Sequence, residues 1–517
     1  MATPVNTISN VTDIPVGGVG VYILDAGPTR SIRGNLSQTV GYVITAEWGP
    51  AEVWYEPLSA NDLVERHWPF GPTGGFYGIS NLPKVRAKFW RVLGTSPVKS
   101  TKTFQDGAGS PADSLEVTAK YYGTDGDKIK ITITANADDS DARDVRVYMQ
   151  DPATGVIAHD ETYVALQADD GTVTDPGDPY VTFTKASGAT LAAAVAAGVS
   201  LAGGSSGTIA ATDFADAFTA AGSPVNGIDI LCPVEPASSI LAATNAALYT
   251  FATSAAGRNI LCYGCSPASE AAGTALTTVA NYRSVYLNFY YPWRRVQRRV
   301  FYSYRGTATS VTQTLCGGPL LAAMRAKLVP GDAAMMSTVA EWNSSVVGLD
   351  TGATDVDESG YATLAAAGIT AWYYNDEFGY VPYNDVCTYL VNSVPIAGDL
   401  KPYKVYASDA IAQYMAGFLG KPLDLDLGTE TLGPVTRAQI GAIRKFLKAE
   451  TTAGRIIGGQ NSDGSTSPAW SVDPFSLATS DNLADGRWDV SIQARKTPRQ
   501  RQNVLYTQID LSVDIRN

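Results

Sequence analysis

From Asn226 to Tyr290, short apolar runs alternate with longer helical patterns, and this rhythm restricts the fold more than any other feature of the chain. The expected strands cover 228–233, 259–263 and 284–290, and the expected helices cover 237–256 and 271–281. Strands that alternate with helices form a parallel sheet covered by helices. We therefore expect an α/β core domain over 226–400. No Gly-x-Gly-x-x-Gly pattern joins the first strand to the first helix, so a dinucleotide-binding site is not indicated.

The segment 101–225 has a different pattern and is expected to form a β-rich domain inserted before the core. Over 114–183, polar and apolar residues alternate, with Asp- and Gly-rich breaks between the runs. Such alternation is typical of half-buried strands. The acidic stretch 138–141 lacks the spacing and the terminal Glu of a calcium loop, so a solvated turn is expected there. After Thr190, an alanine-rich stretch predicts a helix that ends before Leu201.

Two further parts flank these domains. The segment 21–100 is expected to be α+β in character, with a strand in 39–50, a helix at 59–66 and a strand at 84–93. The segment 401–517 is expected to form a C-terminal domain with helices at 408–419 and 434–450. Just before it, a helix that ends at Gly368 is expected to turn into a strand at 369–372.

The expected helix at 434–450 has two different faces. Ile440, Ile443 and Leu447 form an apolar face. The basic face consists of Arg437, Arg444, Lys445 and Lys448. This basic face is either a solvated surface or a surface for contact with another protein.

Both chain ends have the sequence of extended segments. Residues 1–20 are polar and β-branched with little helix signal, and glycines precede a strand that begins near Val21. At the other end, 486–495 and 503–515 alternate polar and apolar residues, which predicts a β-hairpin. Its turn contains the basic residues Arg495, Lys496, Arg499 and Arg501. The last strand joins either a sheet of its own chain or, by strand addition, a sheet of a neighbouring subunit.

Composition argues against several classes of function. The net charge of −12 disfavours generic binding to nucleic acid or to an anionic membrane. The sequence has no run of about 18 apolar residues and no signal-peptide pattern, so neither a membrane span nor secretion by a signal peptide is expected. Two histidines leave little material for a triad or a multi-histidine metal site. The pair Cys262 and Cys265 has the spacing of redox and zinc sites, but no second pair completes a zinc set, so reduced thiols with a structural role are expected. We expect no catalytic activity and no cofactor, although a pair of carboxylates that meets only in the fold remains an alternative.

Several short motifs, in order along the chain, resemble those of the tail sheath proteins of contractile bacteriophages and related contractile injection systems. Gly-Val-Tyr, Ser-Ile-Arg-Gly and Glu-Trp-Gly-Pro stand near the start, and Ala-Lys-Tyr-Tyr-Gly stands in the insertion. Leu-Ala-Gly-Gly-Ser-Ser-Gly precedes the core, and Tyr-Pro-Trp, Ala-Gly-Ile-Thr and Gly-Arg follow it. These motifs lie at 20–22, 31–34, 47–50, 119–123, 201–207, 291–293, 367–370 and 486–487. The stretch from Thr307 to Ser359 departs most from the family pattern.

The resemblance implies an α/β and α+β multidomain fold, with an α/β sheath core, an inserted β-rich domain and extended terminal arms. It implies a structural protein of the virion that assembles in the host cytoplasm as stacked hexameric rings around a tail tube, with baseplate and tail terminator proteins as further partners. Contraction of this helical lattice drives the tube through the bacterial envelope. The implied donor-strand residues are Val5, Ile8, Val11, Leu505, Ile509, Leu511 and Val513. Both basic groups named above are candidates for contact with the tube or a neighbouring subunit, and the resemblance implies no direct contact with nucleic acid and no membrane insertion.

Three alternatives remain at this point. The chain could be the sheath of a phage-derived contractile injection system, which would share every motif. A self-assembling surface-layer or adhesin protein would share the acidic, glycine-rich composition but should carry an export signal. An α/β enzyme would share the core but should present a glycine fingerprint or a catalytic constellation.

Overall fold

A computed structural model of the 517-residue chain describes most of its length. The described residues are 5–8, 21–24, 38–57, 60–69, 85–152, 155, 157–168, 170–187, 190–234, 236–257, 260–300, 309–327, 346–351, 356–375, 379–391, 393–397, 407, 410, 411, 415, 421, 423–460, 465–484 and 488–494. The chain divides into two compact units. The first consists of Met1–Pro330 and Ala334–Gly420, and the second of Gly331–Ala333 and Lys421–Asn517.

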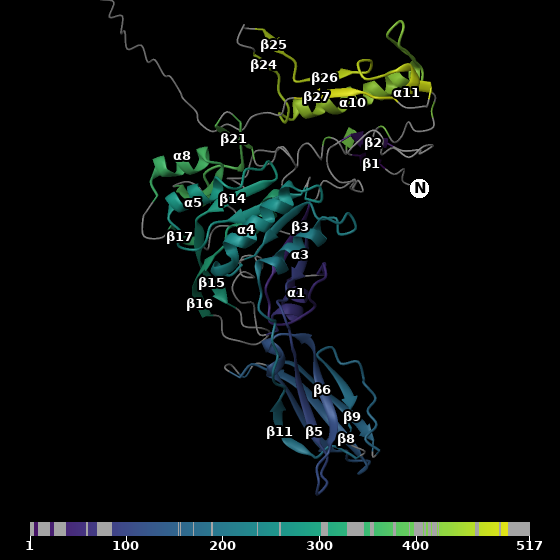
Figure 1. Cartoon of the computed structure of the whole chain (residues 1–517), viewed down its shortest axis with the longest axis vertical. Helices are drawn as coiled ribbons and strands as arrows, with labels where there is room; N and C mark the ends of the chain where they lie inside the picture. The colour runs from purple at the N-terminus through teal and green to yellow at the C-terminus, as the bar shows by residue number, and fades with distance from the viewer. Residues whose placement is uncertain are drawn as a thin grey trace, which may run out of the picture. The chain divides into compact units, whose positions relative to one another are not determined.

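The centre of the first unit is a seven-stranded sheet (Figure 1). In spatial order its strands are β19 (Gly379–Pro382), β18 (Ile369–Asn375), β14 (Leu287–Tyr291), β13 (Leu261–Cys265), β12 (Ile230–Pro233), β3 (Thr39–Ile44) and β4 (Arg86–Arg91). All neighbours are parallel except β18 and β19. Every residue of β3, β12, β13 and β14 is buried, as expected for parallel strands covered on both faces.

Helices cover both faces of this sheet. On one face pack α3 (Ala211–Ala221), α4 (Ser238–Thr253), α5 (Ala272–Val279) and α8 (Glu358–Ala366). On the other face pack α1 (Ala60–His67) and α6 (Gly318–Lys327). The predicted strands and helices of 226–290 are therefore confirmed. So is the helix that ends at Gly368, whose φ of +85° allows the sharp turn into β18.

The core sheet also includes strands from the segment 21–100, which was expected to be a separate part of the chain. The strands β3 and β4 and the helix α1 were predicted within 21–100, and all three form. However, β3 pairs with β12, which lies about 190 residues later in the chain, as the bond from Thr39 N to the Asp229 carboxylate also records. These two strands therefore belong to the core sheet rather than to a separate α+β part.

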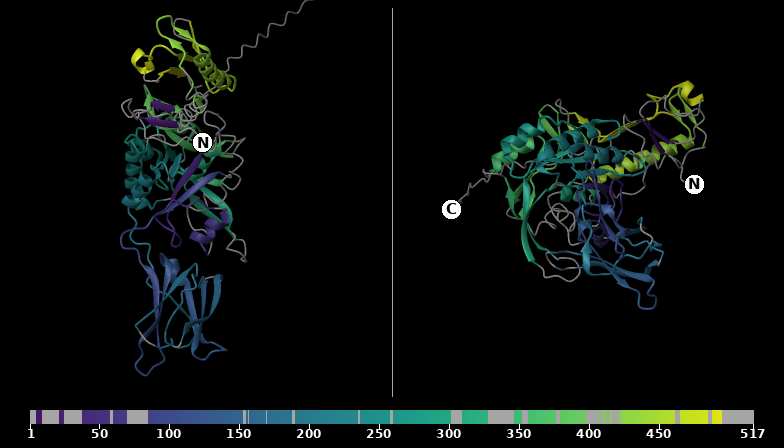
Figure 2. Two further views of the ribbon diagram at one scale, coloured as in Figure 1. Left: turned by 90° about the vertical axis from the view of Figure 1, so that its right-hand side faces the viewer. Right: turned by 60° about the horizontal axis from the view of Figure 1, so that its bottom comes forward.

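The insertion is an antiparallel β-domain built from two sheets (Figures 1 and 2). One sheet has the order β10 (Val181–Lys185), β6 (Asp113–Tyr122), β5 (Lys99–Gln105). The other has the order β11 (Val195–Ser200), β7 (Ile129–Ala135), β8 (Ala142–Gln150), β9 (Ile157–Ala168). Alternate residues of β6, β7 and β8 point into a shared apolar cluster, which confirms the predicted alternation.

The helix predicted between Thr190 and Leu201 is wrong, because this segment forms the strand β11. It pairs with β7 through Val195 with Ile133 and Val199 with Ile131, with a bulge between the two pairs. Alanine favours helices in isolation, but the open edge of β7 offers backbone partners that a helix here would leave unpaired. Tertiary pairing therefore overrides local propensity.

Smaller sheets complete the first unit. They are the pair β1 (Val5–Ile8) and β2 (Val21–Leu24), the sheet β16 (Thr309–Leu315), β15 (Trp293–Val300), β17 (Val346–Asp350), and the pair β20 (Val386–Val391) and β21 (Val394–Ala397). A short 3-10 helix, η2 (Thr124–Lys128), follows β6. None of the described helices is long and apolar enough to span a membrane.

The described residues of the second unit form one long helix, α10 (Pro434–Thr452), and the short helix α11 (Ser480–Ala484). Three two-stranded sheets accompany them: β22 (Leu425–Asp426) with β23 (Thr431–Leu432), β24 (Gly459–Gln460) with β25 (Thr466–Ser467), and β26 (Trp470–Asp473) with β27 (Ser491–Ala494). The helix predicted at 434–450 is thus confirmed. The helix predicted at 408–419 lies largely outside the described residues.

Candidate functional site

The helix α10 is held at its start by a neighbouring carboxylate. Pro434 is its first residue, a position where the missing N–H costs nothing. Asp424 accepts hydrogen bonds from the backbone N–H groups of Val435 and Thr436, both at 2.7 Å, and from the Thr436 hydroxyl at 2.6 Å. These bonds satisfy helix N–H groups that have no partner within the helix, so the start of α10 is well defined.

The two faces of α10 are those expected from the sequence. Ile440, Ile443 and Leu447 are buried, and Phe446 joins them. The residues Arg437, Arg444, Lys445 and Lys448 are all exposed. Among the residues that the structure describes, none of the four forms an ion pair, and Arg437 donates only to the Leu432 carbonyl, at 2.8 Å. The helix therefore presents four exposed positive side chains, which we call the basic face of α10.

Part of the N-terminal arm is a strand. Val5 and Ile8 are the first and last residues of β1, which runs parallel to β2 of the same chain with Val5 opposite Val21 and Ile8 opposite Leu24. The arm is thus extended, and here its partner is another strand of its own chain. Addition of this strand to a neighbouring subunit stays a prediction. Val11 lies outside the described residues.

The C-terminal arm is described only at its beginning. The strand β27 belongs to the first half of the predicted hairpin and pairs with β26, with Ser491 opposite Asp473 and Ala494 opposite Trp470. The second half of the hairpin and its turn lie outside the described residues. The hairpin residues outside the described ranges include the candidate donor-strand residues and the basic turn residues. These are Leu505, Ile509, Leu511 and Val513, and Arg495, Lys496, Arg499 and Arg501.

The cysteine pair noted in the sequence is divided between two cores. All five cysteines are buried thiols, and none of them is in a disulfide bond. Residues three apart in a strand point to opposite faces of the sheet, and Cys262 lies in the cluster under α3 and α4, whereas Cys265 lies in the cluster under α6. Within the described ranges, no group of three or more His, Cys, Asp or Glu side chains is placed to hold a metal ion.

The two histidines are also packed into the fold. His67 is almost fully buried, and its Nδ1 lies 3.2 Å from the Trp48 carbonyl. Burial lowers the pKa of His67 to about 4, because the charged ring would lose its hydration; the Trp48 carbonyl only partly offsets this. His67 is therefore neutral at pH 7 and packs in the fold as an uncharged ring.

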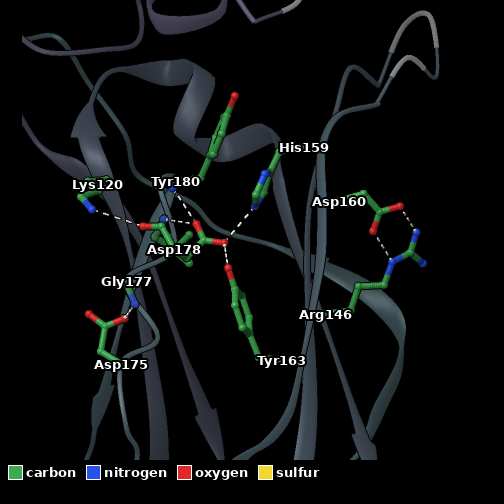
Figure 3. A network of polar contacts seen from close by, with 10 residues as sticks. Lys120, Arg146, His159, Asp160, Tyr163, Asp175, Gly177, Asp178 and Tyr180 are labelled. Carbon is green, nitrogen blue, oxygen red and sulfur yellow. Dashed lines mark hydrogen bonds and ion pairs between the residues drawn. The ribbon is translucent and has the colours of Figure 1, made fainter.

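A buried carboxylate, missed by the sequence analysis, organises the insertion domain (Figure 3). Asp178 accepts hydrogen bonds from the backbone N–H groups of Tyr180 (2.6 Å) and Val181 (2.9 Å), from the Tyr163 hydroxyl (2.6 Å) and from His159 Nε2 (2.9 Å). Burial opposes ionisation, but the hydrogen bonds from His159, Tyr163 and Tyr180 hold the pKa of Asp178 below its usual range. No local motif marks this residue, since two of its partners are 15 and 19 positions away.

Comparison with known proteins shows a likeness in structure but not in sequence. No protein-family model matches the chain, and no curated protein sequence matches it. A solved sheath tail protein from Desulfitobacterium hafniense is similar over 93% of this chain and 96% of its own, with a TM-score of 0.57 and 13% identity. A sheath tail protein from Listeria innocua is similar over 90% of this chain and 96% of its own, with a TM-score of 0.54 and 14% identity. The chain therefore has a mixed α/β fold shared with sheath tail proteins over nearly its full length.

Proposed function

We propose that this chain belongs to the contractile tail sheath family and is the sheath subunit of a bacteriophage tail. Stacked hexameric rings would surround a tail tube in the virion, end at a baseplate and a terminator protein, and contract to drive the tube through the bacterial envelope. The observation that carries this proposal is the likeness in fold to two sheath tail proteins, which spans 93% and 90% of this chain. The ordered sequence motifs support it independently.

Strand addition between subunits is the proposed means of connection. A two-stranded sheet is marginally stable by itself, and no further strand pairs with β26 or β27 in the part of the chain that the structure describes. Their outer edges offer the backbone groups that an added strand needs. The proposed donor strands carry Val5, Ile8 and Val11 at one end of the chain, and Leu505, Ile509, Leu511 and Val513 at the other.

The basic face of α10 is the proposed surface for contact with the tube or with a neighbouring subunit. Its four positive side chains stand out from a protein with a net charge of −12. Exposed charges contribute little to the stability of a single chain, so their clustering on one helix face is better suited to recognition of an acidic surface. The basic turn at Arg495, Lys496, Arg499 and Arg501 is proposed as a second contact of this kind.

Assembly with and without the arms tests the proposed function. We would image the intact chain, with its tube protein as template, beside a chain that lacks 1–17 and 500–517, by negative-stain electron microscopy. Sheath-like cylinders from the intact chain and soluble subunits from the shortened one are expected. If the intact chain forms no cylinders when it is produced together with its tube protein, the sheath assignment is contradicted.

A pair of charge reversals tests the basic face separately. Arg444→Glu with Lys448→Glu should reduce the yield or order of cylinders, because both residues are exposed and one turn apart on α10. Lys102→Glu with Lys185→Glu is the matched control, since it changes the charge equally at two exposed positions of the insertion domain. Equal yields and lengths of cylinders from the two variants would remove the basic face from the proposed contacts.

A further inference from the structure

The insertion domain and the core are connected by more than the covalent chain. The polypeptide passes between them twice, and the two passages are held together by bridges between Thr95 and Thr208 and between Val98 and Ser205. A ribbon of two strands could by itself act as a hinge. Whether the domains can turn relative to each other therefore depends on the contacts beside the ribbon.

The most central of these contacts is made by Arg91, the last residue of β4. Its guanidinium is buried and donates from Nε to the Ala46 carbonyl and from Nη1 to the Gly49 carbonyl, both at 2.7 Å. Nη2 donates to the Tyr122 carbonyl at 2.9 Å and to the Ser206 hydroxyl at 3.0 Å. The first two acceptors lie on the turn after β3, and the other two lie on the insertion side. One rigid, planar group thus holds both domains.

This guanidinium remains charged at neutral pH. Burial lowers the pKa of Arg91 to about 10, while the nearby carboxylates of Glu47 and Asp125 favour the charged form. Hydrogen bonds from a charged donor are the stronger ones, and a buried charge cannot give them up without a large penalty. Any rotation that separates Tyr122 and Ser206 from the turn would leave this charge without half of its acceptors.

Trp48 gives a second, apolar connection from the same turn. Although it follows a core strand, its indole is buried in the hydrophobic cluster of the insertion domain. It packs edge-on against Tyr121 at a centroid distance of 5.2 Å and stacks on Tyr180 at 5.6 Å. Tyr180 in turn stacks on His159 at 4.3 Å, beside Asp178 (Figure 3). The insertion domain therefore encloses a side chain that the core supplies.

Glu47 adds a third connection at the surface. Its Oε2 accepts from the backbone N–H and the hydroxyl of Thr124, both at 3.2 Å, and from the Ser206 hydroxyl at 2.8 Å. Its backbone carbonyl accepts from Asp125 N at 3.3 Å. The approach is close enough that a Cβ on Gly123, whose φ is +116°, would collide with the Glu47 carbonyl. The turn after β3 thus takes part in all three connections, through the carbonyls that Arg91 contacts and through the side chains of Glu47 and Trp48.

We propose that Arg91, Trp48 and Glu47 lock the insertion domain to the α/β core, so that the two behave as one rigid body in the single chain. Arg91 is the positioning residue of this lock, because its buried guanidinium donates to the turn and to both sides of the insertion. The proposal concerns the unassembled chain and holds or fails independently of the proposed function. If the sheath function also holds, the insertion domain follows every movement of the core.

Pulsed electron paramagnetic resonance on the full chain tests this lock. Spin labels would be attached at Ser140→Cys, in the insertion domain, and at Thr250→Cys, on α4; both positions are exposed, whereas the five native cysteines are buried. A single narrow distance distribution is expected. With Arg91→Ala its width should at least double. Arg86→Ala is the matched control, because Arg86 lies on the same strand but is exposed and pairs with Glu56 at the surface.

Two milder variants keep the test decisive if Arg91→Ala does not fold. Arg91→Lys retains the charge but cannot reach four acceptors with one ammonium group, so it should also broaden the distribution. Glu47→Ala removes an exposed side chain and should broaden it to a smaller extent. Circular dichroism establishes that each variant is folded. A broad distribution in the unmodified chain, or an unchanged width in Glu47→Ala and in every folded Arg91 variant, overturns the proposal.

Discussion

Removal of the Asp178 carboxylate should destabilise the insertion domain strongly, although the residue lies in no motif. In Asp178→Ala, four donors lose their acceptor: two backbone N–H groups, the Tyr163 hydroxyl and His159. His159 is about 10% exposed and can turn toward water, whereas the site of the carboxylate is fully buried. The main cost therefore comes from the backbone groups of Tyr180 and Val181, which cannot move without disrupting β10.

The size of this effect follows from those two groups. Each buried donor left without an acceptor costs about 1–3 kcal/mol, so the loss in free energy of unfolding should be about 2–6 kcal/mol. The nearby pair of Arg146 and Asp160 has equally good geometry, at 2.7 Å, but both side chains are more than 40% exposed. Solvent screens such a pair, and Asp160→Ala should cost less than about 1 kcal/mol. Figure 3 shows both sites in one view.

Native-state hydrogen exchange, read by mass spectrometry on peptides from β7 and β8, measures this difference within the full chain. A loss of about 2 kcal/mol corresponds to roughly a 30-fold decrease in protection when exchange requires opening of the whole domain. Asp160→Ala is the internal control. The argument that burial determines how much each carboxylate contributes to stability would be refuted by equal effects from the two substitutions. A decrease in protection of less than about fivefold for Asp178→Ala would also refute it.

Three further predictions concern the core. His67 has a pKa of about 4 in the folded chain and an ordinary pKa of 6.5 in the unfolded chain, so as the pH falls the unfolded chain takes up the proton first. The contribution of neutral His67 to the free energy of unfolding is therefore complete above pH 6.5, and it should fall by about 3 kcal/mol as the pH drops to about 4. Urea unfolding of His67→Gln should show a correspondingly flatter pH dependence in this window, and an unchanged slope would contradict the assignment. The five buried thiols should not react with a thiol reagent in the native chain and should all react in urea; rapid native reaction at any of them would show that its core is open. Gly368→Ala should lower the free energy of unfolding by about 1–3 kcal/mol, since φ is +85° and a Cβ would lie 2.9 Å from the Cys387 carbonyl; Gly273→Ala, at an open helical position, is the control that should be neutral or stabilising in the same assay.

The elements of the core could be predicted from the sequence because their signals are local. Burial on both faces requires apolar runs, and a helix that packs on one side requires a repeat of 3.6 residues, so the strands and helices of 226–290 and the two faces of α10 are visible in the sequence itself. The same holds for the alternation of β6, β7 and β8. Gly368 could be placed at the end of a helix for a similar reason, because the chain turns there through the positive φ of this one residue.

The candidate surfaces were predictable to different extents. The basic face of α10 depends on helical spacing alone, and the structure exposes all four of its side chains. The pairing of β1 with β2 was not foreseen, because an extended segment carries no information on which edge it joins. The likeness of the sequence motifs to those of sheath proteins and the likeness in fold lead to the same proposed function by separate routes.

Long-range pairing was decided by the tertiary structure only. The sequence by itself determined the strands and helices of 226–290, the two faces of α10 and the alternation of β6, β7 and β8, since these depend on neighbours a few residues away. It did not determine that β3 pairs with β12 and so brings β4 into the core sheet, that β11 is a strand, or that Trp48 enters the insertion domain. It also left Arg91 and Asp178 unmarked, because a buried charge is recognised by acceptors or donors that come from distant parts of the chain. Such partners meet only when the chain has folded and water has been excluded from the site. In the absence of water, each hydrogen bond is electrostatically stronger.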